Sequence, residues 1–255
     1  MTSDHARVVV VIPAFNSERT IGRVIDGIPK RVVSEIIVVD DGSRDGTYEA
    51  ALRKKAVVLK HARNLGYGAG QKTLFKEALK RNARVVVVLH DDLQYPPELI
   101  PQMSAPIMRD DGDVVLGTRR RMIQGGMPLW RFLGNRFLTF LENLALDQQL
   151  TEYHTGYRSF SAKALNSIDF DSLSNDFDFD SQIIFRMIER GMKIVEVPIP
   201  TVYGIGSSSI APARAVKYGI QIILMVLKRL PLRILRKAGL HGRSSNGRCR
   251  RNCSV

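Results

Sequence analysis

Short runs of β-branched residues alternate with helical patterns along the first half of the chain. The runs are almost continuously apolar, which is typical of parallel strands buried on both faces. Strand–helix alternation of this kind predicts right-handed crossovers and a mostly parallel sheet. We expect strands at residues 8–12, 35–39, 56–60, 84–89 and 113–116, and helices at 18–28, 47–54 and 70–81, with a further helix beginning at Pro96-Pro97.

The second half is less regular and ends in a basic segment. It predicts long helices at 129–146 and 178–190 and a strand at 193–197. Two basic amphipathic helices follow at 216–228 and 232–238, separated by Pro231. From Leu240 onward Gly, Ser, Asn and Arg dominate, a composition typical of disorder. We therefore expect one α/β domain over residues 1–210, basic amphipathic helices over 211–239, and a disordered basic tail over 240–255.

The net charge of +13 comes almost entirely from the C-terminal segment. No carboxylate follows Glu196, whereas 11 of the 38 Lys and Arg residues do, so the preceding part carries 27 basic and 25 acidic residues. The body is thus nearly neutral and lacks a basic face studded with aromatic residues, so we expect no specific nucleic-acid partner. The two cysteines, Cys249 and Cys253, lie in the last seven residues, which excludes a disulfide scaffold.

No segment has the pattern of a signal peptide or a membrane span. The N-terminal apolar run at 8–12 is closed by Pro13, and the stretch at 219–227 is interrupted by Gln221. A span needs roughly 18 apolar residues or more. We expect a cytoplasmic protein. The basic helices are equally compatible with packing on the domain's own core and with lying on an anionic membrane surface.

Polar clusters follow four of the expected strands, at residues 13–18, 40–47, 64–70 and 90–97. Each taken alone has an ordinary explanation: a turn and helix cap at 40–47, a flexible loop at 64–70, or a solvated acidic loop at 90–92. The glycine spacing at 66, 68 and 70 also fails to match G-x-G-x-x-G. In open parallel sheets, however, ligands gather at the carboxyl ends of strands. The convergence of the clusters at one edge therefore favours a binding site.

The residue types in these clusters suit a metal-bound nucleoside diphosphate. Carboxylates and a side-chain amide at an open edge are ligands for Mg²⁺ or Mn²⁺, whose coordination substrate phosphates complete. Glycines without a Cβ let the backbone approach a ligand closely. A buried Asp can accept hydrogen bonds from a base or ribose.

The order and spacing of these segments resemble those of family 2 glycosyltransferases of the GT-A fold, and among them the polyprenyl-phosphate (dolichyl-phosphate) sugar synthases. The resemblance covers about residues 7–225 and implies a mostly parallel central sheet flanked by helices. The matching segments are Ile12-Pro-Ala-Phe-Asn-Ser-Glu18, Val39-Asp-Asp-Gly-Ser-Arg-Asp-Gly-Thr47, Asn64-Leu-Gly66, Asp92-Leu-Gln94, Gly117-Thr-Arg119 and Thr155-Gly-Tyr-Arg158.

Roles for individual residues follow from this resemblance. It implies that Asp92 and Gln94 bind the metal, that Asp92, Arg119 and Arg158 are catalytic, and that both arginines meet phosphate charge. Asp41 would hold the base or ribose. The full nucleotide-sugar site that it implies comprises Pro13, Phe15, Glu18, Asp41, Gly66, Asp91, Asp92, Gln94 and Arg119.

The chain departs from the family pattern at two places. His90 stands at the first acidic position of the usual D-x-D, which also leaves open a degenerate, non-catalytic relative. The basic residue that many relatives place after Tyr203-Gly204 is absent from residues 206–209, and Arg214 or Lys217 are candidates to replace it.

The resemblance implies inverting, metal-dependent transfer of a sugar from a UDP- or GDP-sugar to a polyprenyl phosphate, by a protein peripheral to the cytoplasmic face of a membrane. A phosphate acceptor is already anionic and needs no strong base. The alternative is a soluble family 2 glycosyltransferase acting on a sugar hydroxyl. That acceptor needs a general base, for which Glu152, Asp178 and Asp180 are the candidates.

Overall fold

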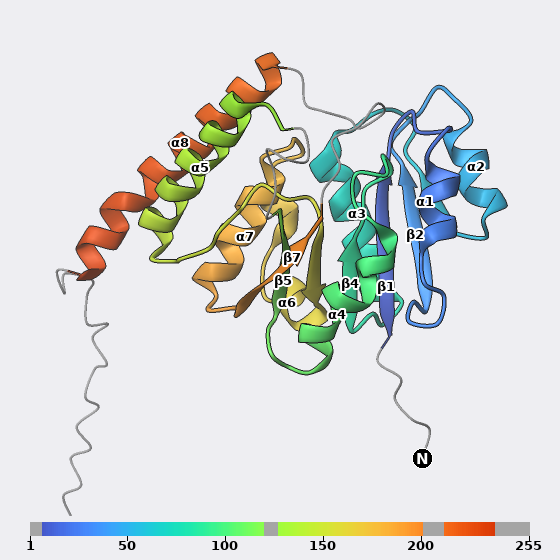
Figure 1. Ribbon diagram of the computed structural model, residues 1–255, viewed down its shortest axis with the longest axis horizontal. Helices are drawn as coiled ribbons and strands as arrows, with labels where there is room; N and C mark the ends of the chain where they lie inside the picture. The colour runs from blue at the N-terminus through green and yellow to red at the C-terminus, as the bar shows by residue number, and fades with distance from the viewer. Residues whose placement is uncertain (1–6, 120–126, 201–211, 238–255) are drawn as a thin grey trace, which may run out of the picture.

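The computed structural model of the chain describes residues 7–119, 127–200 and 212–237 (Figure 1). Its centre is a seven-stranded sheet with helices on both faces, so the predicted mostly parallel α/β architecture is confirmed. The strands are β1 Val8–Ala14, β2 Glu35–Asp40, β3 Val57–Lys60, β4 Val85–Val88, β5 Val114–Arg119, β6 Arg158–Ser161 and β7 Ile194–Ile199. The helices are α1 Ile21–Gly27, α2 Thr47–Arg53, α3 Tyr67–Lys80, α4 Ile100–Met108, α5 Leu129–Leu146, α6 Ala162–Asn166, α7 Phe179–Glu189 and α8 Pro212–Lys237, with short 3₁₀ turns at Pro97–Leu99 and Phe170–Ser172.

The strand order β3-β2-β1-β4-β6-β5-β7 places β1 at the point where the direction of winding reverses. β1 pairs in parallel with β2 through Val10 and Ile36, and with β4 through Val9 and Val86. Connections from β1 lead first toward β3 and then to the opposite side, where β4 lies. A crevice forms outside the carboxyl ends of the strands at such a reversal. The topology therefore locates a ligand site at the ends of β1 and β4.

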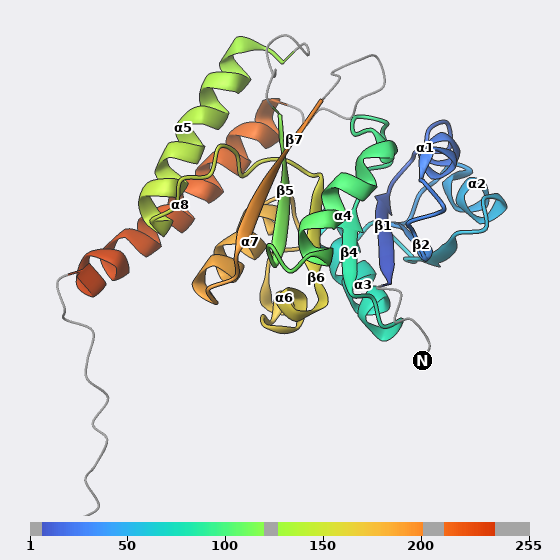
Figure 2. The same ribbon diagram turned by 60° about the horizontal axis from the view of Figure 1, so that its bottom comes forward.

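Alternating side chains of the strands fill two separate cores. On β1, Val8, Val10 and Ile12 pack with α1, α2 and α4 on one face of the sheet. Val9 and Val11 pack with α3, α6 and α7 on the other face. The same helices cover the two faces in Figure 2. The burial of both faces explains why the strands are continuously apolar in the sequence.

A pair of long helices, α5 and α8, lies beyond α7 and outside the two sheet layers (Figures 1 and 2). They share a third core in which Leu138 and Ala145 of α5 meet Ile222 and Val226 of α8 and Phe185 of α7. The bounds of α5 coincide with the expected helix at 129–146. The two helices expected around Pro231 are instead one helix, α8, because a proline within a long helix can kink it without ending it.

Strand β6 has no counterpart among the expected elements. Its four residues, Arg-Ser-Phe-Ser, carry no apolar run, yet all are buried between β4 and β5, to which the strand is antiparallel. Strand β7 extends through Pro198, where the sequence predicted its end. It is the last strand in the sheet order, and an edge strand tolerates a proline. The predicted tail at 240–255 and residues 203–209 lie outside the described residues.

Helix α3 begins three residues earlier than the glycine run suggests. The backbone at Ser174 and Asn175 presses against its first turn, where the Gly68 amide donates to the Asn175 carbonyl at 2.8 Å. A Cβ at Gly66 would lie 2.4 Å from the Asn175 oxygen, and one at Gly68 would lie 2.4 Å from the Ser174 oxygen. Gly66 also has φ of +102°, which side chains other than hydrogen rarely tolerate. At Gly66 and Gly68 the close approach comes from the chain's own backbone, where the sequence suggested a ligand.

Replacing Gly68 with alanine tests this backbone contact. We expect Gly68→Ala to lower the free energy of unfolding by about 1–3 kcal/mol, since the added methyl group must displace the Ser174 carbonyl. Urea unfolding measures the change. Gly134→Ala is the matched control: an added Cβ there meets nothing within 4 Å, so the better helix former stabilises α5 by up to about 1 kcal/mol. Equal stability of Gly68→Ala and the wild type would contradict the contact.

Candidate active site

A cavity of about 1100 Å³ opens at the carboxyl ends of β1, β4 and β5 and continues to α5 and α8. It lies where the reversal in strand order places a crevice. Most of the predicted site residues line its wall: Pro13, Phe15, Asp41, Gly66, Asp91, Gln94, Arg119 and Arg158. Two predicted residues are not on that wall, Glu18 and Asp92.

Asp41 holds the loop that follows β3. Its carboxylate accepts the backbone N–H groups of Leu65 and Gly66 at 2.9 and 3.0 Å, and its Oδ1 lies 2.6 Å from Nδ1 of His61. The other ring nitrogen of His61 lies 3.0 Å from the hydroxyl of Thr73 on α3. Asp41 is 6% exposed, which leaves little access for water. The three protein partners take up most of the hydrogen-bonding capacity of its carboxylate. Asp41 therefore fixes the conformation of this loop, and its predicted contact with a base or ribose stays a prediction.

Glu18 takes part in the hydrogen bonds that join the loops after β1 and β2. Its carboxylate accepts the N–H of Gly46 at 3.1 Å, and its own N–H donates to Asp45 at 3.2 Å. Beside it, the Asn16 side chain accepts from the Arg44 amide at 3.0 Å. Burial opposes ionisation of the Asp45 carboxylate, but the hydrogen bonds that it accepts, with that of the Thr47 side chain the largest of them, together outweigh burial and lower its pKa. Glu18 therefore joins these two loops and is not among the residues that line the cavity, and its predicted place in the nucleotide pocket stays a prediction.

Residues 90–94 form a tight turn at the end of β4. Asp92 is 8% exposed and accepts the N–H of Gln94 at 3.0 Å, while Leu93 between them has φ of +61°. This turn presents Gln94 and Asp91 to the cavity. Asp91 also accepts the Phe15 amide at 3.1 Å, which joins the ends of β1 and β4. Burial, assisted by the neighbouring Asp92 charge, raises the pKa of Asp91 above its ordinary value.

The donor set fits a hard divalent cation that substrate phosphates help to hold. Among the described residues, no three His, Cys, Asp or Glu side chains are gathered around a common point for a metal. A magnesium or manganese ion in a nucleotide site needs only one or two protein carboxylates. Two adjacent carboxylates, one with its pKa raised by burial and by the other's charge, and the Gln94 amide oxygen meet that need. Asp91 lies on the cavity wall, whereas the sequence favoured Asp92.

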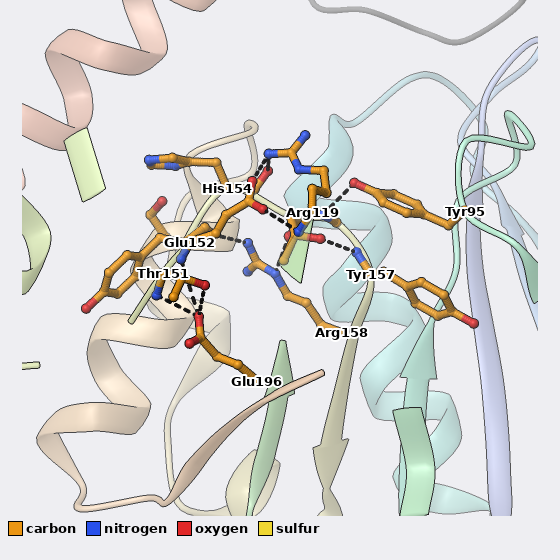
Figure 3. A network of polar contacts seen from close by, with 12 residues as sticks. Tyr95, Arg119, Thr151, Glu152, His154, Tyr157, Arg158 and Glu196 are labelled. Carbon is orange, nitrogen blue, oxygen red and sulfur yellow. Dashed lines mark hydrogen bonds and ion pairs between the residues drawn. The ribbon is translucent and has the colours of Figure 1, made fainter. Parts of the chain in front are cut away.

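Arg119 and Glu152 form a buried ion pair at the end of β5 (Figure 3). The Arg119 guanidinium contacts Oε1 of Glu152, and the Arg119 amide donates to Oε2 at 3.1 Å. The guanidinium also donates to the His154 carbonyl at 3.2 Å. Glu152 is in turn placed by Glu196 of β7, whose carboxylate accepts the amides of Thr151 and Glu152. Arg119 lines the cavity, and the carboxylate of Glu152 balances its positive charge.

Arg158 is 1% exposed and holds the segment before β6. Its guanidinium donates to the carbonyls of Thr155 at 2.6 Å and Tyr153 at 2.8 Å, and also to the carbonyl of Asp180. Three backbone acceptors thus occupy its nitrogens, as Figure 3 shows for the loop carbonyls. Arg158 shapes the cavity wall, and its predicted contact with phosphate stays a prediction.

The three carboxylates named as candidate bases have different surroundings. Glu152 is paired with Arg119, and Asp178, 6% exposed, accepts from Gln182 at 2.6 Å. Asp180 alone of the three lines the cavity, where it accepts the Tyr67 hydroxyl at 3.1 Å and lies 3.4 Å from Arg158. Burial, followed by the charge of Asp180, raises the pKa of Tyr67 well above its ordinary value.

Several wall residues escaped the sequence analysis because they come from the irregular half of the chain. Arg131 and Asn135 of α5 and His154 of the following loop line the cavity. Lys217 of α8, one of the two replacement candidates, also lines it and pairs with Asp176 at 2.7 Å. The side chain of Arg214 lies outside the described part of the structure. The excess of Lys and Arg after residue 196 drew attention to α8, whereas no pattern in the sequence marked Arg131, Asn135 or His154.

Removing one partner of the Arg119–Glu152 pair tests how the other depends on it. We expect Glu152→Ala to lower the free energy of unfolding by about 3–5 kcal/mol, because it leaves a buried guanidinium unpaired. The double variant Arg119→Met/Glu152→Leu should regain most of the loss. Asp26→Ala is the control: it breaks an exposed pair with Lys54, and we expect a change below about 1 kcal/mol. Urea unfolding of the four proteins measures the differences, and similar losses in both single variants would contradict this account.

The chain resembles known glycosyltransferases in both sequence and fold. The family model for glycosyl transferase family 2 matches residues 9–169. The undecaprenyl-phosphate mannosyltransferase of Micrococcus luteus is 31% identical over 207 residues, which cover 76% of this chain and 82% of that protein. The UDP-N-acetylglucosamine–dolichyl-phosphate N-acetylglucosaminyltransferase of Methanococcus voltae is 28% identical over 215 residues, covering 77% and 86% respectively.

Among solved structures, glucosyl-3-phosphoglycerate synthase of Mycobacterium tuberculosis in complex with Mn²⁺ and UDP-glucose superposes with a TM-score of 0.70. The sequence identity is 21%, and the match covers 89% of this chain and 79% of that chain. At this identity the likeness concerns the fold, and it confirms the expected GT-A architecture.

Proposed function

Because the chain belongs to glycosyltransferase family 2, we propose that it transfers a sugar from a nucleotide diphosphate to a polyprenyl phosphate, with inversion at the anomeric carbon. The observation that carries the proposal is the extent of the cavity. It joins the carboxyl ends of β1 and β4 to the α5–α8 pair in one space of about 1100 Å³. One end has the residues for a nucleotide diphosphate, and the other opens between helices that expose apolar side chains.

The donor lies at the end of the cavity formed by β1, β2 and β4. Phe15 is 47% exposed on the wall and offers a ring face to a nucleobase. The loop held by Asp41 brings Asn64 and Gly66 beside it. Asp91, Asp92 and Gln94 would hold Mg²⁺ or Mn²⁺ against the diphosphate. When bound, that ion neutralises charge on the leaving diphosphate, so no acid is required to protonate it.

The acceptor lies at the other end, where α5 and α8 form the wall. Arg131 and Lys217 bring positive charge to this end, and Arg119 lies between the two ends. A phosphate there keeps its negative charge, and its oxygen attacks the anomeric carbon while the bond to the nucleoside diphosphate breaks. The protein's residues orient the two reactants and exclude water. The anionic acceptor needs no residue in the role of a strong base, which agrees with the pairing of Glu152 with Arg119.

An apolar stripe on each of α5 and α8 supports a lipid acceptor. Both stripes begin at the cavity, at Trp130 and Val216. Each stripe follows helical spacing and lies on a different face of its helix from the residues that pack in the third core. The α5 stripe comprises Leu129, Trp130, Leu133, Phe137, Phe140 and Leu144, and the α8 stripe comprises Val216, Ile220, Leu224 and Leu227, all more than 40% exposed.

We assign this exposed surface to the face of a membrane. The segment after Glu196 has 11 basic residues and no acidic one, and each Lys or Arg near an anionic lipid surface adds about 1 kcal/mol of attraction. Amphipathic helices of this type lie in the plane of the interface with the apolar stripe buried. Among the helices of the described residues, none combines the length and apolarity of a bilayer-spanning segment. The proposed location is therefore peripheral, at the cytoplasmic face where nucleotide sugars are found.

Transfer assays with extracted lipid test the proposed acceptor. We expect one of the UDP- or GDP-sugars, with Mn²⁺ or Mg²⁺, to give a labelled product that partitions into organic solvent when polyprenyl phosphate is present. A product that stays in water and needs a sugar hydroxyl acceptor would favour the soluble alternative. The same donor should raise the melting temperature of the protein only when the metal is present, which identifies the base independently of any acceptor.

Substitutions in the 90–94 turn test the metal site. We expect Asp91→Asn and Asp92→Asn each to lower kcat by about 100-fold or more, since charge stabilisation of the leaving group is lost. Both variants should also lose the metal-dependent thermal shift with the nucleotide sugar. Asp111→Asn, an exposed carboxylate paired with Arg109, is the control and should behave like the wild type. Near-full activity of Asp92→Asn with Mn²⁺ would remove Asp92 from the metal site.

Vesicle binding tests the apolar stripes. We expect Phe137→Ser/Phe140→Ser to weaken binding to vesicles of anionic phospholipid by on the order of tenfold or more, because two exposed rings lose their burial in lipid. Leu52→Ser on α2, also about half exposed, is the matched control and should bind normally. Unchanged sedimentation of the double variant would contradict the assignment. A change from dimer to monomer on gel filtration would instead assign the face to a second copy of the chain.

A further inference from the structure

A buried network of polar side chains links α5, α7 and α8 to the loop before β6, with His154 at its centre. His154 Nδ1 lies 2.7 Å from the hydroxyl of Tyr218 on α8, and Nε2 lies 3.2 Å from Oε2 of Glu142 on α5. The Tyr218 hydroxyl is also 2.8 Å from Oγ of Ser181 on α7. Glu142 and Ser181 are 0% exposed, and the His154 side chain is 5% exposed. One imidazole thus joins segments that are distant in the sequence.

The chemistry of these groups limits which of them can donate and which can accept hydrogen bonds in the network. Nε2 of His154 faces the Glu142 carboxylate, a group that only accepts hydrogen bonds. The Tyr218 hydroxyl can donate to Nδ1 of His154, and the Ser181 hydroxyl can in turn donate to the phenol oxygen. Burial, together with the Glu142 charge, raises the pKa of the Tyr218 phenol far above its ordinary value, so the phenol keeps its proton and remains a donor. The Tyr218 hydroxyl is thus hydrogen-bonded to both His154 and Ser181, whereas Nε2 of His154 and the Glu142 carboxylate approach to 3.2 Å without a hydrogen bond.

The backbone carbonyl of His154 connects this network to the active site. Its carbonyl accepts from the Arg119 guanidinium at 3.2 Å, and Glu152, two residues earlier, contacts the same group. The ring of the same residue lies against Tyr218 of α8 and Glu142 of α5, so its side chain ties the position of this segment to the two helices. A displacement of α8 that withdraws Tyr218 would therefore loosen the loop that holds Arg119.

We infer that His154 is a positioning residue, which together with Glu142 and Tyr218 fixes the Arg119 guanidinium relative to α8. The inference rests on the proposed function, in which Arg119 meets phosphate charge between the two reactants. It adds a consequence: the position of α8, the helix whose stripe we assign to the lipid surface, and the geometry of the transfer site are coupled. A phosphate on a lipid that enters between α5 and α8 then meets an arginine held by those same helices.

Tyr218→Phe tests the coupling, because it removes the hydroxyl and keeps the ring in its edge-on contact with His154, at 5.5 Å between centroids. We expect kcat for sugar transfer to fall about tenfold to hundredfold, as misplacement of a charged group by an ångström does, with KM for the nucleotide sugar changed less than about twofold. Tyr153→Phe is the matched control. Its hydroxyl also ties this loop to α5, through Asn143 Oδ1 at 3.0 Å, without touching His154. Its kcat should stay within about twofold of the wild type.

Two substitutions of His154 separate its two ring contacts. Asparagine keeps an acceptor near the place of Nδ1, whereas glutamine keeps a donor near the place of Nε2. Since the link to α8 runs through Nδ1, we expect His154→Asn to retain more of the wild-type kcat than His154→Gln. Equal losses in the two Tyr variants, or a wild-type kcat in Tyr218→Phe, would overturn the inference.

Side-chain NMR of Arg119 keeps this test independent of the acceptor. We expect the Arg119 Nε–Hε resonance to move in Tyr218→Phe and to stay in place in Tyr153→Phe. If it does not move, His154 does not position Arg119, whatever the protein glycosylates. If it moves while the wild type transfers no sugar to polyprenyl phosphate, the positioning stands and the proposed acceptor is wrong.

Discussion

The ion pair between Arg119 and Glu152 is the interaction on which the middle of the cavity depends. Each charge is buried, and each would be severely destabilising without the other. The arginine ends a parallel strand, and the glutamate lies in the loop before the antiparallel β6. Their attraction therefore holds an irregular segment over the edge of a regular sheet. Arg158 extends the same arrangement, since it binds the carbonyls of that loop and of the start of α7.

The cavity combines two kinds of support. On one side, hydrogen bonds between loops after β1 and β2 hold the polar clusters, as in the pairing of Glu18 with Gly46. On the other side, α5 and α8 pack through a small apolar core and reach the site through buried polar contacts of His154 and Tyr218. The first side rests on β1 and β4, whose residues are almost all buried. The second side depends on how α5 and α8 pack, which suits the lipid acceptor that we propose.

The two long helices also show how one sequence pattern can serve two surfaces. Their buried residues, such as Leu138 and Ile222, are no more apolar than the exposed Phe140 and Leu224 on other faces of the same helices. A helix apolar on more than one face needs a second environment besides its own core. In a family whose named relatives act on undecaprenyl and dolichyl phosphates, a lipid surface is the environment that we propose.

The alternation of apolar runs and helical patterns was sufficient to predict the parallel sheet, most of its strands and the edge where polar residues meet, because burial on both faces leaves a continuous signal. It also predicted that Asp41, Asp91, Gln94 and Arg119 come together, and they line one cavity, since the ends of parallel strands share one edge. The sequence could not reveal β6, whose Arg-Ser-Phe-Ser residues become a strand only between β4 and β5. Nor could it assign Glu18, Asp92 and Arg158 to their actual partners, or bring His154 to Tyr218, because these contacts depend on side-chain directions that the packing of distant segments decides.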